Sequence, residues 1–193
     1  MPPKAKITRE MVVEAAFDVA RENGAEEISA RSVAERLGCS TQPVMYHFKT
    51  IEELKRAAYA KADAFHTEYI TGFQAEPGDI MKGIGLRYIR FAAREKNLFR
   101  FLFQSNLAEG SIAGMIDSED AAPITGMMSM AMGLDAERTK KVFLAVAMFA
   151  HGYASMLANN TLEYNEDEIM RHMEFAYNGA VLAVKEENNE KTV

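Results

Sequence analysis

The stretch that decides the fold runs from Ser29 to Lys49 and reads SARSVAERLGCSTQPVMYHFK. It divides at Gly38-Cys39 into two short pieces with helical apolar spacing, each preceded by a serine that suits the N-cap of a helix. Pro43 falls in the first turn of the second piece, where its missing N–H is harmless. Val44 and Phe48 share one side of that helix because they are four residues apart. The spacing predicts two short helices joined by a tight turn.

One amphipathic helix precedes this pair and a long helix follows it. Thr8 suits the N-cap of the first helix, and Gly24 suits its end. Residues 50–53, TIEE, combine a hydroxyl with a carboxylate three residues later, which is the pattern of a capping box. This box predicts the start of a helix over 51–73. The first three helices therefore predict a helix-turn-helix domain over 1–50.

The rest of the chain is expected to be helical as well. Apolar spacing near 3.6 residues recurs almost everywhere, and glycine, proline and capping residues separate the segments. We therefore predict an all-α fold. An N-terminal three-helix helix-turn-helix domain over 1–50 is followed by a C-terminal helical domain over 51–193, and the helix over 51–73 links the two.

Composition excludes several classes of protein. With 26% charged and 48% hydrophobic residues, the 193-residue chain has a globular composition. One cysteine excludes an intrachain disulfide framework and a four-thiolate metal site. No secretory pattern opens the sequence, so a cytoplasmic location is expected. The apolar stretch 142–158 is shorter than the ~20 residues of a membrane helix, so we expect a buried or partner-facing helix and no membrane partner.

Charge is distributed unevenly along the chain. Residues 1–62 carry ten Lys and Arg against nine Asp and Glu, a net of +1, whereas residues 63–193 carry twelve against nineteen, a net of −7. The acidic remainder would repel polyanions, and the N-terminal third would not. Its basic residues gather at its two ends, at Lys4, Lys6 and Arg9 and at Lys49, Lys55 and Arg56.

A helix-turn-helix unit suits duplex DNA. The second helix of such a pair fits the major groove, and the side chains near its start reach the edges of the bases. Gln42 lies at that start and can bond adenine through two atoms. Thr41 can meet a phosphate or a thymine methyl group. Tyr46 and Lys49 can bind the backbone further along.

Residues 8–58 resemble the DNA-binding domain of the TetR (tetracycline-repressor-like) transcriptional regulators. The resemblance rests on the joint spacing of the opening helix to Gly24, residues 29–34 (SARSVA), 37–40 (LGCS), 41–44 (TQPV), His47-Phe48 and 52–54 (EEL). It implies a homodimer that binds a near-palindromic operator in double-stranded DNA. It also implies an all-helical C-terminal domain that dimerises and binds a small-molecule effector, and a repressor that a small hydrophobic effector releases.

The resemblance also assigns residues. It adds Ser40, Arg31 and His47 to the DNA-binding set, although Arg31 can equally be a solvated helix residue and His47 can equally pack at the turn. Family members usually carry Tyr at the position of Met45, and here Tyr46 is its neighbour. They often carry Lys at the position of Ile51. Both departures weaken phosphate contact, for which Tyr46 and Lys49 are possible substitutes.

Two sets of residues in the C-terminal part have a structural and a functional interpretation. Thirteen methionines and several phenylalanines predict either a compliant core or a cavity for an apolar effector. The cavity candidates are Phe91, Phe99, Phe103, Met127, Met130, Phe149 and His151. Small and large apolar residues on the last two helices predict either internal packing or a two-fold four-helix dimer interface. The interface candidates are Ala145, Phe149, Ser155, Met156, Phe175, Val181 and Leu182.

No catalytic or cofactor motif stands out in the sequence. The four histidines lack tight metal-ligand spacing with cysteine or carboxylates, so no metal site is expected. Ser/His/Asp motifs, glycine-rich phosphate loops and nucleophile elbows are missing. We therefore expect no enzyme and no cofactor. The alternatives are a helical small-molecule-binding protein and a DNA-binding architectural protein without an effector.

Overall fold

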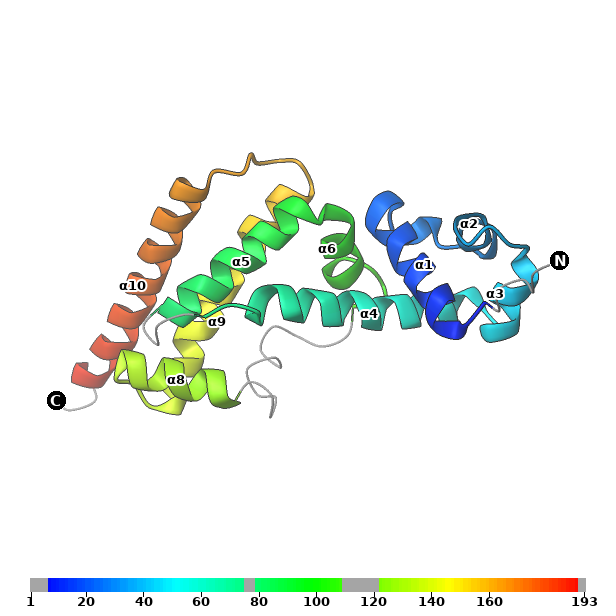
Figure 1. The fold of residues 1–193 in the computed structure, drawn as a ribbon. Coiled ribbons are helices and arrows are strands. Elements are labelled where there is room, and N and C mark those ends of the chain that lie inside the picture. The colour runs from blue at the N-terminus through cyan, green and yellow to red at the C-terminus, as the bar shows by residue number, and fades with distance from the viewer. Residues whose placement is uncertain (1–6, 75–78, 109–121, 191–193) are drawn as a thin grey trace. The chain divides into compact units, whose positions relative to one another are not determined.

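The computed structural model describes residues 7–74, 79–108 and 122–190, and over these residues the chain is helical without a strand (Figure 1). The all-α prediction is confirmed. The helices are α1 (Arg9–Asn23), α2 (Ala30–Arg36), α3 (Thr41–His47), α4 (Ile51–Thr71), α5 (Ile80–Arg94), α6 (Lys96–Phe103), α8 (Ala122–Met132), α9 (Ala136–Ala158) and α10 (Glu166–Glu190), with a 3-10 turn η1 at Ala25–Glu27.

The helices group into two compact units. The first contains α1 to α3, α4 as far as Glu68, and the segment from Glu95 to Ala108 with α6. The second contains residues 69–94, with α5, and the described part of 109–193. This grouping follows packing and gives α6 to the first unit. The predicted functional boundary after residue 50 stays a prediction.

Local capping explains where the first helices begin and end. The Thr8 hydroxyl accepts a hydrogen bond from the Met11 N–H, and Gly24, at φ 105°, ends α1. Ser29 and Ser32 cap α2 reciprocally. Gly38 lies in the turn before α3 at φ 63°, a conformation that glycine adopts without strain. The helix-turn-helix therefore forms where the sequence predicts it.

The core of the first unit is small and tightly packed. Val12, Val33, Val44 and Leu54 are fully buried, and Phe48 is nearly so. Val12, Val33, Val44 and Leu54 come from α1, α2, α3 and α4, in that order, and Phe48 directly follows α3. Because α3 packs into this shared core, its outer face has a fixed direction relative to the other helices of the unit.

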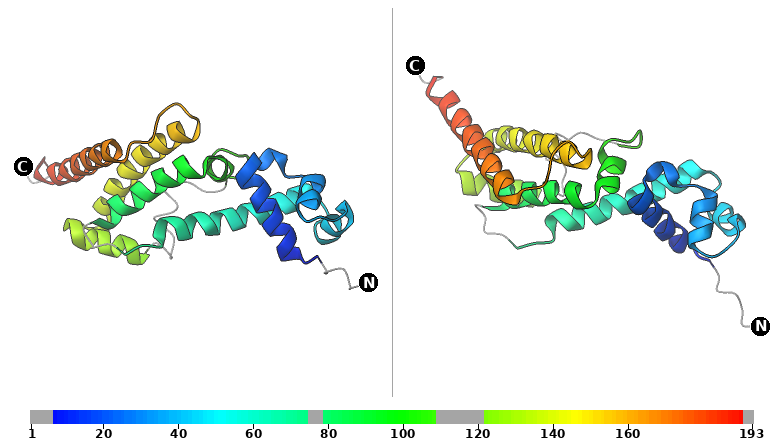
Figure 2. Two further views of the ribbon diagram at one scale, coloured as in Figure 1. Left: turned by 45° about the horizontal axis from the view of Figure 1, so that its top comes forward. Right: turned by 90° about the horizontal axis from the view of Figure 1, so that it is seen from above.

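The second unit is built around α9. This helix packs against α5, α10 and α8, and α10 also packs on α5, as Figure 2 shows from two directions. A Cβ at Gly85 of α5 would meet the terminal methyl group of Met173 on α10, so the flexible Met173 side chain would have to shift.

The helix that holds the longest apolar stretch is α9. α9 has 23 residues, and in the described part of the chain it is the one helix long and apolar enough to cross a membrane. The apolar stretch 142–158 is only part of this helix, because polar turns before Val142 extend it to Ala136. Its packing decides the matter: Val142, Val146 and Leu157 are buried against neighbouring helices, so α9 is a core helix of the second unit.

Candidate nucleic-acid interface

The outer face of α3 carries the side chains expected to meet DNA. Thr41, Gln42 and Tyr46 are exposed, and Tyr46 is 81% exposed despite its large ring. Val44, on the opposite face, is fully buried. Tyr46 and Gln42 can therefore enter a DNA major groove while the core that holds α3 stays folded.

Two further predicted residues lie at the ends of α3. Ser40 occupies the N-cap in an extended conformation, and its side chain makes no capping hydrogen bond. Lys49 is exposed, and its backbone N–H donates to the Glu53 carboxylate at 3.0 Å. The Glu53 N–H donates in turn to the Thr50 hydroxyl at 3.1 Å. The capping box at α4 is therefore displaced by one residue, with Lys49 in place of Thr50 as the backbone donor.

His47 occupies a different environment from its neighbours. It is half-buried, and its Nε2 lies 2.9 Å from the carbonyl oxygen of Ile7. Its ring also meets the Tyr46 ring edge-on, with centroids 5.2 Å apart. His47 therefore contacts the chain just before α1 as well as the exposed side of α3.

Met45, the residue that stands where the family usually has tyrosine, is 40% exposed. It offers no hydrogen bond donor for a phosphate, whereas Tyr46 beside it offers a hydroxyl. The other departure, Ile51, is half-buried at the start of α4.

Arg31 lies on α2 and pairs with Glu35 at 2.9 Å, with both side chains largely exposed. Exposed pairs of this kind are worth at most about 0.5 kcal/mol. A phosphate could therefore replace Glu35 as the partner of Arg31 at little cost.

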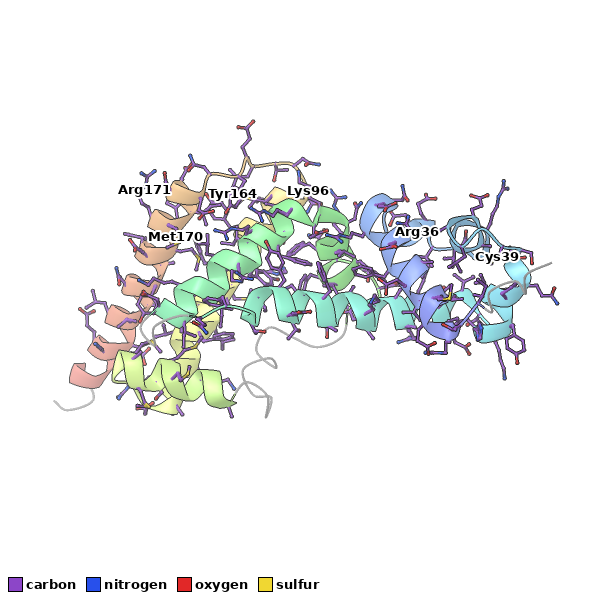
Figure 3. All side chains as sticks on the ribbon, viewed as in Figure 1. Arg36, Cys39, Lys96, Tyr164, Met170 and Arg171 are labelled. Atoms are coloured by element: carbon purple, nitrogen blue, oxygen red, sulfur yellow. The ribbon has the colours of Figure 1, made fainter. Side chains whose placement is uncertain are left out.

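Arg36 has a structural role that the sequence did not reveal. Its guanidinium joins α2 to α1 through Glu22, at 2.6 and 2.7 Å, and through Asp18, at 3.1 Å. These acceptors raise the pKa of Arg36 further above its already high ordinary value. Figure 3 labels Arg36 on α2 and Cys39 in the following turn. Cys39 is half-buried there, as a small apolar residue would be.

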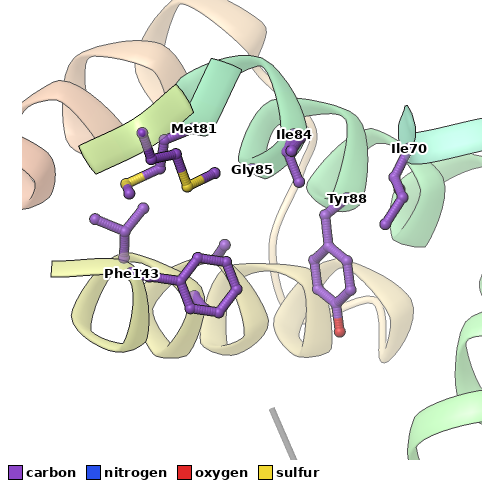
Figure 4. A pocket seen from close by; sticks show the side chains of 10 residues that line it. Ile70, Met81, Ile84, Gly85, Tyr88 and Phe143 are labelled. Carbon is purple, nitrogen blue, oxygen red and sulfur yellow. The ribbon is translucent and has the colours of Figure 1, made fainter. Parts of the chain in front are cut away.

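A cavity of about 70 Å³ lies within the second unit (Figure 4). Residues of α5, α8, α9 and the end of α4 line it. Its lining consists of Ile70, Met81, Ile84, Gly85, Tyr88, Met128, Phe143, Val146, Ala147 and Ala150. Tyr88 supplies the one polar side chain of this lining.

The Tyr88 hydroxyl lies 2.9 Å from Nδ1 of His151, so the two form a hydrogen-bonded pair between α5 and α9. Burial raises the pKa of Tyr88 and lowers the pKa of His151. Both groups are therefore uncharged at neutral pH, and the cavity carries no formal charge.

The predicted effector residues do not line this cavity. Phe91 and Phe99 are fully buried in the two cores, and Phe103 meets the His66 ring in the first unit. Met130 is 84% exposed. Met127 is also exposed, and Phe149 packs against Tyr153. His151 does not line the cavity, but it forms a hydrogen bond with Tyr88, which does. Their role in ligand binding stays a prediction.

The sequence did not single out the residues that do line the cavity. Ile84 and Tyr88 were recognisable as one side of an amphipathic helix, but periodicity does not tell which part of that side packs imperfectly.

The predicted dimer residues share one property, which is that none of them is buried. Phe175 is 83% exposed, Leu182 57% and Met156 44%, while Ala145 is exposed and Phe149, Ser155 and Val181 are half-buried. Large apolar side chains exposed on packed helices are typical of an interaction surface. We call these seven residues the α9–α10 surface.

Over the residues described, no three His, Cys, Asp or Glu side chains come together as a metal site. The cationic Lys4 and Lys6 of the predicted basic cluster lie outside the described residues.

A scan against protein-family models found no match, and no curated protein is significantly similar in sequence. Solved structures match over nearly their whole length. A Rhodococcus sp. regulator assigned to the TetR family is 16% identical, with a TM-score of 0.61 over 90% of this chain and 98% of that one. A Rhodococcus sp. Rha1 transcriptional regulator is 17% identical, with a TM-score of 0.60 over 92% and 97%.

A third structure, a TetR-family member from Streptomyces coelicolor A3, is 18% identical, with a TM-score of 0.59 over 87% of this chain and 96% of that one. At such low identity the likeness concerns architecture, and it covers both helical units. The chain therefore has the fold of the TetR-family transcriptional regulators.

Proposed function

We propose that this protein is a TetR-type DNA-binding transcriptional regulator, not an enzyme, that acts in the cytoplasm. As a homodimer it represses by occupying a near-palindromic operator, and a small hydrophobic effector releases it. The observation that carries the proposal is the outer face of α3. There Thr41, Gln42 and Tyr46 are exposed on a helix that Val44 anchors in the core.

The chemistry of this face suits base edges and phosphates. Gln42 lies in the first turn, the part of a recognition helix that reaches the bases, and its amide can both donate to and accept from adenine. Ser40 and Tyr46 offer hydroxyl groups to phosphates on either side. Lys49 and Arg31 offer exposed cations.

The small size of the proposed recognition helix α3 favours a dimer. A seven-residue helix contacts too few base pairs for operator specificity, and two copies related by two-fold symmetry read two half-sites. The α9–α10 surface supports this assembly, because Phe175 and Leu182 would lose their exposed apolar area in a symmetric contact.

The cavity supports an effector. An effector that binds the DNA-incompetent arrangement more tightly shifts the population away from operator binding. A rival architectural protein would keep its operator affinity across a ligand screen, and a rival small-molecule carrier would bind no operator at all.

The test is a pair of substitutions on α3. Gln42→Ala with Tyr46→Ala removes both proposed contacts without touching the core, so operator binding should fall by at least tenfold while helicity and dimer mass stay unchanged. Gln74→Ala, an exposed glutamine in the second unit, is the matched control and should bind as the unaltered protein does. Unchanged binding by the α3 variant would refute the recognition helix.

A further inference from the structure

A polar cleft lies between α8 and the start of α9, within the second unit. Its volume is about 410 Å³, which falls in the range of roughly 300–1,000 Å³ that is typical of small-molecule sites. The apolar cavity beside Tyr88 measures about 70 Å³, and the cleft and the cavity have no lining residue in common. The cleft is therefore a feature separate from the proposed effector cavity.

Thr139 is the buried polar residue of this cleft. Its side chain belongs to the lining, and the residue is only 1% exposed. None of the residues that the structure describes forms a hydrogen bond with its Oγ1. A hydroxyl that is buried without a partner destabilises the folded chain. A polar ligand in the cleft would supply the missing partner.

Two further hydroxyl groups line the cleft from α8. The Thr125 hydroxyl donates to the Ala122 carbonyl oxygen at 3.0 Å. The Ser129 hydroxyl donates to the Leu134 carbonyl oxygen. Because a hydroxyl has one hydrogen, both groups can only accept hydrogen bonds from a ligand, whereas Thr139 can donate or accept. The hydroxyls of the cleft therefore suit a ligand that carries several hydrogen-bond donors.

The charged side chains of the cleft balance each other. Glu137 is exposed and adds one negative charge, and Lys140 is half-buried and adds one positive charge. Small residues, Ala122, Gly126 and Ala136, complete the lining with apolar surface. A hydroxyl-rich molecule meets all three conditions, because hydroxyl groups donate and accept without carrying charge, and a sugar ring presents C–H groups as well.

We propose that the cleft between α8 and α9 is a second small-molecule site, which takes a neutral mono- or disaccharide and offers the Thr139 hydroxyl as its buried hydrogen-bond partner. Glu137 accepts from the hydroxyl groups of the sugar, and Lys140 donates to them. The inference goes beyond the proposed function, because the site does not depend on DNA binding. It makes the second unit responsive to two chemically different molecules, an apolar one in the cavity and a hydroxyl-rich one in the cleft.

The experiment titrates the full chain in a calorimeter with glucose, galactose, mannose, maltose, sucrose and trehalose. Dilute sugar is used because concentrated sugars stabilise proteins in general by exclusion from their surfaces. At least one sugar should bind at one molecule per chain, whereas the zwitterion L-alanine and the anion phosphate should give no heat of binding. Failure of every sugar to bind, or tighter binding of L-alanine or phosphate, would overturn the inference.

Thr139→Val keeps the shape of the side chain and removes its hydroxyl. The affinity for the sugar should fall about tenfold, and the melting temperature without sugar should not fall, because no hydrogen bond within the protein is lost. Thr161→Val removes an exposed hydroxyl outside the cleft and should bind the sugar as the unaltered protein does. Unchanged affinity in Thr139→Val, or a lower melting temperature, would contradict the role of this hydroxyl.

Gly126→Leu tests the location of the site by filling the cleft from α8. A Cβ at Gly126 meets no atom within 4 Å, so the larger side chain enters the cleft without a clash at its base and should abolish sugar binding. Ala131→Leu adds the same side chain at an exposed position of α8 outside the cleft lining, and should retain sugar binding. Equal sugar affinity in these two variants would place the sugar elsewhere and overturn the inference.

Discussion

Asn97 caps the C-terminal end of α1 through Arg21: its side-chain amide donates to the Arg21 carbonyl oxygen at 3.0 Å and also to that of Glu22 at 3.1 Å. The Arg21 guanidinium returns an ion pair to the Glu95 carboxylate. Asn97 in α6 and Glu95 just before α6 thus both contact the C-terminal end of α1. Only Glu95 separates α6 from α5, which lines the cavity. The contacts of α6 with α1 therefore follow α5 directly in the chain.

Asn97→Ala should lower the free energy of unfolding by about 1–2 kcal/mol, because two carbonyl oxygens at the end of a helix lose their donor. Chemical denaturation monitored by circular dichroism measures the loss. Asn106→Ala, at an exposed position of the same unit, should change stability by less than about 0.5 kcal/mol. Equal effects of the two substitutions would deny the cap a role in stability.

His66 should make the protein sensitive to mild acid. It is 1% exposed, and burial lowers its pKa from 6.5 to about 4. Between these values the unfolded chain binds a proton that the folded chain does not, so stability is full above pH 6.5 and falls as the pH approaches 4. The separation corresponds to about 3 kcal/mol.

Denaturation at several pH values compares the unaltered protein with His66→Phe. The phenylalanine variant should lose this part of the acid dependence, whereas His172→Gln, at an exposed histidine, should keep it. An identical acid profile for His66→Phe and the unaltered protein would show that His66 titrates normally.

Phe175→Glu should dissociate the proposed dimer without unfolding the subunit. Phe175 is 83% exposed, so the fold of one chain does not depend on it, whereas a carboxylate in a symmetric apolar contact would face its own copy. Sedimentation measures the mass. Leu162→Glu adds the same charge to a residue 36% exposed outside the α9–α10 surface and should leave the dimer intact. A dimer that persists with Phe175→Glu would remove this surface from the interface.

The cavity should accept uncharged apolar molecules and reject their charged analogues. Toluene should raise the melting temperature, whereas benzoate should not, because its carboxylate would be buried without a cation. Ala147→Leu, which fills the cavity, should abolish the toluene effect, and Ala131→Leu, on the exposed side of α8, should keep it. Equal stabilisation by benzoate would contradict the uncharged lining.

The sequence predicted most of the local structure because caps and turns depend on neighbouring residues. Thr8 and Ser29 cap helices as their positions suggested. The helix expected over 51–73 ends at Thr71. The exposed face of α3 could also be predicted, since Val44 and Phe48 define its buried side.

Long-range packing was not predictable in the same way. That α6 belongs with α1 depends on Asn97 reaching a helix more than seventy residues earlier in the chain. The cavity arises where α5, α8 and α9 pack incompletely, which no single helix pattern encodes. Aromatic and methionine content pointed instead to Phe91 and Phe99, which fill cores, and to Met130, which is exposed.

The central claim is that α3 reads a specific DNA sequence in a dimer. The most direct test is selection of random duplex DNA by the purified protein, followed by titration of the enriched sequence at two salt concentrations. The account predicts an enriched inverted repeat that one dimer binds, with half-sites about one helical turn, or a multiple of it, apart. Weak, salt-sensitive binding with no enriched sequence, in protein refolded to remove any bound ligand, would contradict it.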